Sequence, residues 1–151
     1  ANNNSPLQVV VSGLKKNIDL FSEVLNKSKI KNIKLNVSAP FHCKLMKKAT
    51  NNLKDEILNL NFKEIKNPII SNYNANSSVS GVEIKNLLVS QIEGRVKWLE
   101  SVKFMIDKGT KNFIEIGPGK VLSGLIKRID KNINVKSINN ENDMKELINN
   151  V

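Results

Sequence analysis

The sequence reads Leu35-Asn36-Val37-Ser38-Ala39-Pro40-Phe41-His42-Cys43-Lys44-Leu45-Met46 at the point that decides its fold. Apolar residues that alternate with polar ones, followed by a proline, are typical of a strand that ends in a turn. Beyond the turn, apolar residues recur at helical spacing and form one stripe, which consists of Leu45, Met46, Ala49, Leu53, Ile57 and Leu60. The stretch therefore predicts a strand-to-helix junction, and it places His42, the only histidine in the sequence, at that junction.

His42 has two interpretations. At about 100° per residue, it falls on the N-terminal end of the apolar stripe, so we expect the imidazole to face the interior. The N-terminus of a helix carries a partial positive charge that disfavours imidazolium, so we also expect a neutral ring, which can accept a proton. The residue is then either a general base or a core histidine that bonds a backbone carbonyl, and its position alone leaves both interpretations open.

Composition and charge limit the class of protein. The 151 residues fit one globular domain, with 40% hydrophobic and 25% charged residues. Lysine and arginine outnumber aspartate and glutamate by 24 to 14, and the net charge of +10 favours an anionic partner. The lysines are spread along the sequence, which is typical of a solvated surface.

The single cysteine, Cys43, excludes an internal disulfide, and together with a single histidine it cannot form a Cys/His zinc site. No apolar run approaches the ~18 residues of a membrane span, and no signal peptide opens the sequence. We therefore expect a soluble protein in a reducing compartment.

Predicted strands and helices alternate along the chain. We expect strands at 7–12, 33–37, 68–71, 113–116 and 133–137, and helices at 18–25, 45–60, 84–91, 96–106, 120–129 and from about 143. Residues 1–6 and 72–81 have the composition of loops. This order predicts an α/β architecture with a largely parallel sheet, a β-α-β unit within residues 7–37, and buried strands at 7–12 and 113–116.

Gln91 lies in the last turn of its predicted helix, before the helix-breaking Gly94. The last four carbonyls of a helix have no intrahelical partner. The Gln91 carbonyl can therefore accept the Nδ1–H of a histidine and fix the tautomer that a base requires. A residue that merely faces the core at a helix end fits the same position.

Two further features carry weaker signals. The turn Gly117-Pro118-Gly119-Lys120 follows a predicted strand and precedes a predicted helix, which is a setting for phosphate binding. It lacks the Walker A and G-x-G-x-x-G spacings. A tight turn between strand and helix also explains its glycines. Cys43 and His42 are neighbours on a helix and point about 100° apart, so we expect no Cys-His pair. Because G-x-S-x-G is absent as well, the sequence offers a base without a recognisable nucleophile.

Three segments, in this order, resemble the C-terminal half of malonyl-CoA:acyl carrier protein transacylases. Residues 37–46, Val-Ser-Ala-Pro-Phe-His-Cys-Lys-Leu-Met, resemble the catalytic-histidine motif of that family. Residues 91–98, Gln-Ile-Glu-Gly-Arg-Val-Lys-Trp, resemble Gln-Leu-x-x-Pro-Val-x-Trp, and residues 115–122, Glu-Ile-Gly-Pro-Gly-Lys-Val-Leu, resemble Glu-x-Gly-Pro-Gly-x-x-Leu. Residues 2–13 also resemble the Asn-x-Asn-Ser-Pro-x-Gln-x-Val-x-x-Gly strand, so the resemblance spans nearly the whole chain.

The resemblance implies a fold, a reaction and a set of partners. Residues 1–37 become the remainder of a small ferredoxin-like subdomain, and residues 38–151 the C-terminal part of a large α/β-hydrolase-like subdomain. The implied reaction is ping-pong transfer of malonyl from CoA to the phosphopantetheine thiol of acyl carrier protein, in type II fatty acid synthesis. His42 is then the general base of a Ser-His pair, the Gln91 main-chain carbonyl orients it, and Asn4 is a substrate-binding residue.

No bound cofactor and no metal are implied, since malonyl-CoA and phosphopantetheinylated acyl carrier protein are substrates. Acyl carrier proteins are acidic, which fits the positive net charge. The resemblance also implies the N-terminal half of the same enzyme as a partner, no membrane and no nucleic acid, and a bacterial cytoplasm or a plastid-type organelle as the compartment.

The sequence departs from the family pattern in ways that leave alternatives open. Gly94-Arg95 stands where the family has a residue followed by proline. The serine elbow, the Gly-Gln-Gly oxyanion segment and the carboxylate-binding arginine belong to an N-terminal half outside this sequence, so we expect this stretch alone to be inactive. One alternative is a related acyltransferase for another acyl group. The other is a basic α/β binding module for an anionic partner such as nucleic acid, which predicts interleaved aromatic residues, although these make up only 5% of the chain.

Overall fold

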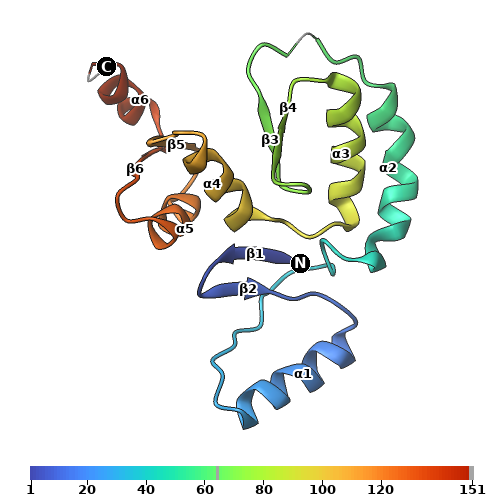
Figure 1. The fold of residues 1–151 in the computed structure, drawn as a ribbon. Coiled ribbons are helices and arrows are strands. Elements are labelled where there is room, and N and C mark those ends of the chain that lie inside the picture. Colours follow the sequence, from blue (N-terminus) through green and yellow to red (C-terminus); the bar gives the residue numbers. More distant parts are fainter. Residues whose placement is uncertain (64, 150–151) are drawn as a thin grey trace.

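The computed structural model describes residues 1–63 and 65–149, in which short strands pair in three separate places with helices beside them (Figure 1). The elements in chain order are β1 (Asn2–Ser5), β2 (Gln8–Val10), α1 (Lys15–Lys27), the 3-10 turn η1 (Lys44–Met46), α2 (Lys47–Asn59), β3 (Ile69–Ser71), β4 (Asn76–Ser78), α3 (Gly81–Glu93), α4 (Trp98–Asp107), β5 (Asn112–Ile116), α5 (Val121–Ile129), β6 (Asn134–Ile138) and α6 (Glu141–Asn149). The predicted α/β class is confirmed. The prediction of a largely parallel sheet is wrong for the described residues, because β1–β2 and β3–β4 are antiparallel pairs and only β5–β6 is parallel.

The core lies where α4 and α5 pack against the β5–β6 pair. Val102, Ile126 and Ile133 form its centre and are at most 6% exposed. The two strands are parallel because the chain crosses back through α5 between them. Side chains of β5 alternate between the two faces, and Ile114 and Ile116 are 50% and 74% exposed. The prediction of a buried strand at 113–116 is therefore wrong for one of its faces.

The helices α2 and α3 lie side by side and run in opposite directions (Figure 1). Lys47 at the start of α2 forms an ion pair of 3.7 Å with Glu93 at the end of α3. At the other end of the pair, the Lys85 ammonium donates to the Leu58 carbonyl at 3.0 Å. This antiparallel arrangement brings the residues that precede α2 next to the last turn of α3.

The first residues form a strand where the sequence predicted a loop. β1 pairs with β2, and on its other side Asn2 forms a bridge with Val96. The Asn3 side chain donates to the Glu100 carboxylate at 3.0 Å, which ties β1 to α4. The strand predicted at 7–12 is shorter than expected and is not buried, since Val9 in β2 is 67% exposed.

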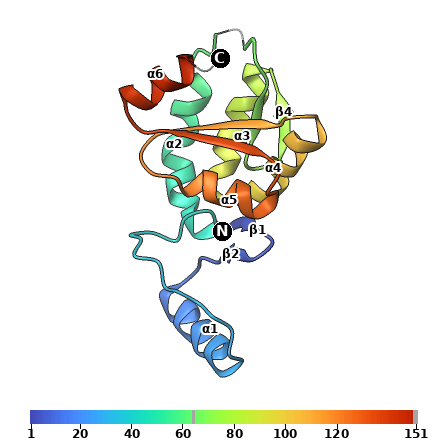
Figure 2. The same ribbon diagram turned by 90° about the vertical axis from the view of Figure 1, so that its left-hand side faces the viewer.

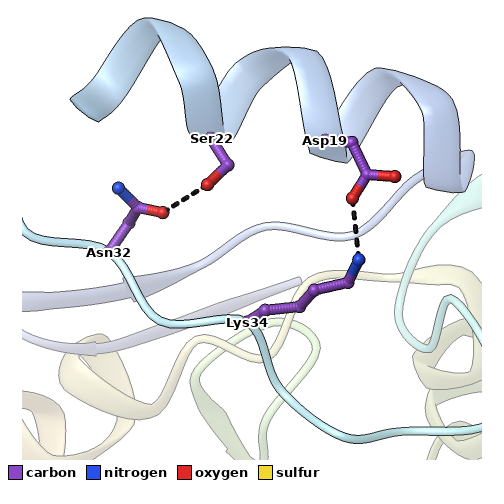
Figure 3. Close-up of polar contacts among 4 residues, drawn as sticks. All are labelled: Asp19, Ser22, Asn32 and Lys34. Atoms are coloured by element: carbon purple, nitrogen blue, oxygen red, sulfur yellow. Dashed lines mark hydrogen bonds and ion pairs between the residues drawn. The ribbon is translucent and has the colours of Figure 1, made fainter. Parts of the chain in front are cut away.

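The predicted strand at 33–37 is absent, and with it the β-α-β unit. Residues 33–37 form no strand, and Ile33 is 75% exposed. Side chains tie the segment to α1 instead (Figure 3): Lys34 forms an ion pair of 2.7 Å with Asp19, and Ser22 donates to Asn32 at 2.6 Å. Figures 1 and 2 both show α1 apart from the other helices.

The residues expected to form a loop at 72–81 contain β4. This strand pairs with β3 in a hairpin whose turn includes Ala75 at φ +58°. The Ala75 N–H donates to the Ser71 carbonyl at 2.8 Å and closes the turn. A polar strand of asparagine and serine lacks the apolar alternation that identifies strands from sequence.

Candidate active site

His42 lies in the turn before α2. The 3-10 turn η1 begins only at Lys44, so the prediction that His42 belongs to the helical stripe is wrong. Its backbone has φ +59°, in the left-handed region, where a residue with a β-carbon is strained by on the order of 1 kcal/mol. Such conformations concentrate at functional sites.

Neighbouring contacts hold this turn in place. The Phe41 N–H donates to the Ala39 carbonyl at 2.9 Å, and the Ser12 hydroxyl donates to the Phe41 carbonyl at 2.8 Å. The adjacent Cys43 thiol donates to the Pro40 carbonyl at 3.1 Å, away from any pairing with the imidazole. The left-handed residue thus turns the chain from the extended segment into η1, with the imidazole half-buried.

The His42 ring lies against the end of α3. Its Nδ1 is 3.0 Å from the main-chain oxygen of Gln91. Because a carbonyl oxygen only accepts, this contact assigns the proton to Nδ1 and leaves Nε2 of the neutral ring as a proton acceptor.

The end of α3 explains why the Gln91 carbonyl is available. The preceding carbonyl, of Ser90, accepts from the Gly94 N–H at 2.9 Å, and Gly94 then leaves the helix with φ −84° and ψ 147°. Gln91 therefore lies in the last turn, where the helical ladder of hydrogen bonds is not continued.

Close packing requires a glycine at this helix end. A β-carbon on Gly94 would lie 2.3 Å and 2.4 Å from two ring atoms of Tyr73 and 2.8 Å from the Ser90 carbonyl oxygen. The Tyr73 ring thus occupies the space beside Gly94. This contact accounts for the glycine at position 94. Sequence reasoning did not find Tyr73, because no local pattern links it to Gly94.

The strand β1 is anchored just beyond this helix end. The Asn3 N–H donates to the Val96 carbonyl at 2.8 Å, and the Val96 N–H donates to the Ala1 carbonyl at 2.7 Å. Asn4 lies in the same strand and is half-buried. Among the hydrogen bonds of the described residues, none joins the Asn4 side chain to His42 or Gln91, so its role in substrate binding stays a prediction.

The Glu115 carboxylate holds the first turn of α5, which follows the Gly-Pro-Gly turn. The Glu115 carboxylate accepts from the N–H groups of Leu122 and Ser123 at 3.0 Å and 2.8 Å, and from the hydroxyls of Ser123 and Ser137. These hydrogen bonds, the Ser123 hydroxyl above all, lower the pKa of the Glu115 carboxyl. The donors at the start of α5 are thus already bonded to a protein carboxylate, which favours the tight-turn interpretation over phosphate binding.

Within residues 1–63 and 65–149, no three histidine, cysteine, aspartate or glutamate side chains gather where they could hold a metal ion. None of the helices in that same part is both long and apolar enough to cross a bilayer.

Comparison with known proteins gives a consistent set of relatives. No protein-family model matches the chain. The malonyl CoA-acyl carrier protein transacylase of Bacillus subtilis (strain 168) is 41% identical over 134 residues, which is 88% of this chain and 42% of the relative. The protein of the same name from Staphylococcus aureus (strain MSSA476) is 40% identical over 149 residues, 96% of this chain and 47% of the relative. The chain therefore spans about half the length of the curated relatives it matches.

Solved structures agree in fold. The malonyl CoA-acyl carrier protein transacylase of Clostridium perfringens superimposes with a TM-score of 0.91 at 34% identity, covering 99% of this chain and 48% of that protein. The transacylase of Xanthomonas oryzae gives a TM-score of 0.93 at 33% identity, with 99% and 48% covered. A malonyl-transacylase in complex with its type II PKS acyl-carrier protein gives 0.93 at 32% identity, with 100% and 49% covered.

Proposed function

We propose that this chain, which is homologous in sequence and fold to about half of a malonyl-CoA:acyl carrier protein transacylase, supplies the general base of such an acyltransferase. The observation that carries the proposal is the 3.0 Å contact between His42 Nδ1 and the Gln91 carbonyl. A Ser-His pair needs a base whose tautomer is fixed by a third group, and a main-chain carbonyl serves this purpose without adding a charge.

The proposed mechanism has two transfers. Nε2 of His42 takes the proton of a serine hydroxyl while the serine oxygen attacks the malonyl thioester carbonyl. The bond to sulfur breaks, and CoA leaves as a thiol with the proton that the imidazolium returns. In the second transfer, the phosphopantetheine thiol gives its proton to Nε2 and attacks the malonyl ester, and the serine oxygen is reprotonated as the malonyl thioester forms.

The serine in this mechanism comes from polypeptide outside the sequence. We propose that it lies in the part of the enzyme that the relatives possess and this chain does not match. Exposed apolar side chains offer a surface for such a partner, among them Ile116 and Val121 at 74% and 70% exposure. The chain alone is then inactive, because it cannot form the acyl-serine.

We further propose malonyl-CoA and the phosphopantetheine arm of acyl carrier protein as substrates, with no bound cofactor. The net charge of +10 favours an acidic carrier protein through long-range attraction. One relative has been solved with its acyl-carrier protein bound. A bacterial cytoplasm or a plastid-type organelle is the compartment that fits this role.

A chimera tests the proposal. In it, this chain replaces the matching part of the Bacillus subtilis transacylase, and malonyl transfer from malonyl-CoA to acyl carrier protein is measured. The substitution His42→Asn keeps a residue type that tolerates the left-handed backbone and removes the base, so transfer should fall by at least ~10². A folded chimera without transfer, or one whose His42→Asn variant remains active, contradicts the proposal. Parallel assays with acetyl-CoA show whether the acyl group is malonyl or another.

A further inference from the structure

The side chain of Gln91 makes a second contact at the end of α3. Its amide nitrogen Nε2 donates to the Gly94 carbonyl at 2.9 Å. The amide oxygen Oε1 is buried and has no hydrogen-bond partner among the described residues. This arrangement fixes the orientation of the amide, because a flipped amide would set two acceptor oxygens against each other.

This hydrogen bond closes a loop of atoms from Gln91 to Gly94 that includes the Gln91 main-chain carbonyl group, which contacts His42. The side chain reaches from Gln91 to the carbonyl three residues later, across the point where the helix ends. Terminal turns fray because their carbonyls lack partners within the helix. The direction of the Gln91 carbonyl depends on this last turn, so a link from Gln91 to Gly94 restricts it.

Two contacts hold the segment that contains the Gly94 carbonyl. The Lys97 N–H donates to the Asn72 carbonyl at 2.8 Å, and the Tyr73 ring packs against Gly94. The Gly94 carbonyl therefore belongs to a segment that is fixed on its other side, and the amide ties the helix end to that segment.

We propose that Gln91 positions His42 with its side chain as well as with its main chain. The amide bond to Gly94 holds the last turn of α3 so that the Gln91 carbonyl stays aimed at Nδ1 and selects one tautomer of the ring. This inference rests on the proposed function, in which that tautomer leaves Nε2 free as the base. The inference also explains why position 91 needs a glutamine, because any residue would supply the main-chain carbonyl.

Nitrogen-15 NMR of the labelled chain tests the inference, since His42 is the only histidine. Two-bond correlations from the ring protons show which ring nitrogen carries the proton, at a pH where the ring is neutral. The unsubstituted chain should show a protonated Nδ1. Gln91→Met keeps the length of the side chain and removes only the bond to Gly94, because Oε1 has no partner to lose. In this variant the Nδ1-protonated form should cease to be the main one.

Two further variants make the result decisive. Gln8→Met, at the only other glutamine, removes a bond to Arg128 and should leave the His42 spectrum unchanged. Gln91→Glu keeps the shape but cannot donate to Gly94, and it replaces Gln91→Met if that variant loses its amide dispersion.

The outcomes separate the inference from the proposed function. A folded Gln91 variant that keeps Nδ1 fully protonated overturns the side-chain role and leaves the proposed function intact. Protonation of Nε2 in the unsubstituted chain overturns the main-chain contact, and with it both the proposed mechanism and this inference.

Discussion

The substitution Gly94→Ala should destabilise the protein through one crowded contact. The new β-carbon would lie 2.3 Å and 2.4 Å from the Tyr73 ring and 2.8 Å from the Ser90 carbonyl oxygen, well inside the ~3.5 Å of an ordinary carbon contact. Tyr73 is 38% exposed, so its ring can swing outward. The Ser90 oxygen belongs to the helix backbone and moves only if the end of α3 moves.

The size of the effect follows from two opposing terms. Overpacking of this kind costs about 1–3 kcal/mol. Gly94 has φ −84°, which alanine adopts without strain, so the lower entropy of the unfolded chain returns about 0.4–1 kcal/mol. The middle values of these ranges, about 2 and about 0.7 kcal/mol, leave a net loss of about 1.3 kcal/mol. The melting temperature of a chain this size should then fall by roughly 3–5 °C.

Circular dichroism during thermal unfolding measures this loss, and two companion variants locate its cause. Gly124→Ala is the matched control, because a β-carbon there meets nothing within 4 Å in the interior of α5; helix propensity should make it stabilising by up to about 1 kcal/mol. In a Tyr73→Ala background, Gly94→Ala should cost less than in the unsubstituted chain. Equal costs in the two backgrounds, or no loss of stability at all, would refute the role given to the Tyr73 ring.

Three further predictions concern the turn before His42, the Glu115 carboxylate and the anionic partner. Ser12→Ala removes the hydrogen bond to the Phe41 carbonyl and should lower the free energy of unfolding by about 0.5–1.5 kcal/mol, as measured by urea titration. The pKa of Glu115 is lowered in the folded state, so the stability that this carboxylate contributes is present above the unfolded pKa and is lost as the pH falls through the folded pKa. Glu115→Gln should therefore flatten the acid limb of a plot of urea midpoint against pH. An unchanged acid limb contradicts this assignment. Acidic acyl carrier protein should be retained by the chimera and released by salt, whereas duplex DNA bound with a steep dependence on salt would favour the nucleic-acid module instead.

The sequence predicts the helices of this fold well because each is encoded locally. Apolar residues at helical spacing, followed by Gly94 or Gly109, predict α3 and α4, whose ends lie within a few residues of those expected. The Gly-Pro-Gly turn is equally local: Gly117 and Gly119 have φ +136° and +92°, which glycine adopts without strain.

Strands are predicted less well because a strand needs a partner that the local pattern does not name. Residues 33–37 alternate as a strand should, yet in this chain they lie exposed, and the Lys34 side chain forms an ion pair with Asp19 of α1. Conversely, the asparagine-rich β1 shows no alternation and still forms a strand, because β2 and Val96 supply its hydrogen bonds. Pairing across the chain decides both outcomes.

The site shows the same division. Sequence reasoning names His42 and the Gln91 carbonyl, because each stands at the end of a recognisable element. It does not find the left-handed backbone of His42, since that conformation depends on contacts from Ser12 and from the turn at Pro40. Nor does it find the bond from the Gln91 amide to Gly94, which depends on how α3 ends.

These unpredicted contacts have a common physical effect on the His42 ring. A carbonyl is a weaker orienting group than a carboxylate, because it offers a dipole in place of a full charge. Its hold on an imidazole therefore depends more on the direction in which it points. The structure restricts that direction from both sides: the strained turn fixes the ring, and the amide link with the crowded Gly94–Tyr73 contact fixes the carbonyl. It follows that substitutions at Gly94 or Gln91 should disturb the tautomer of His42 even where they spare the fold, and that His42 Nδ1 and the Gln91 oxygen should be treated as one unit in any engineering of this site.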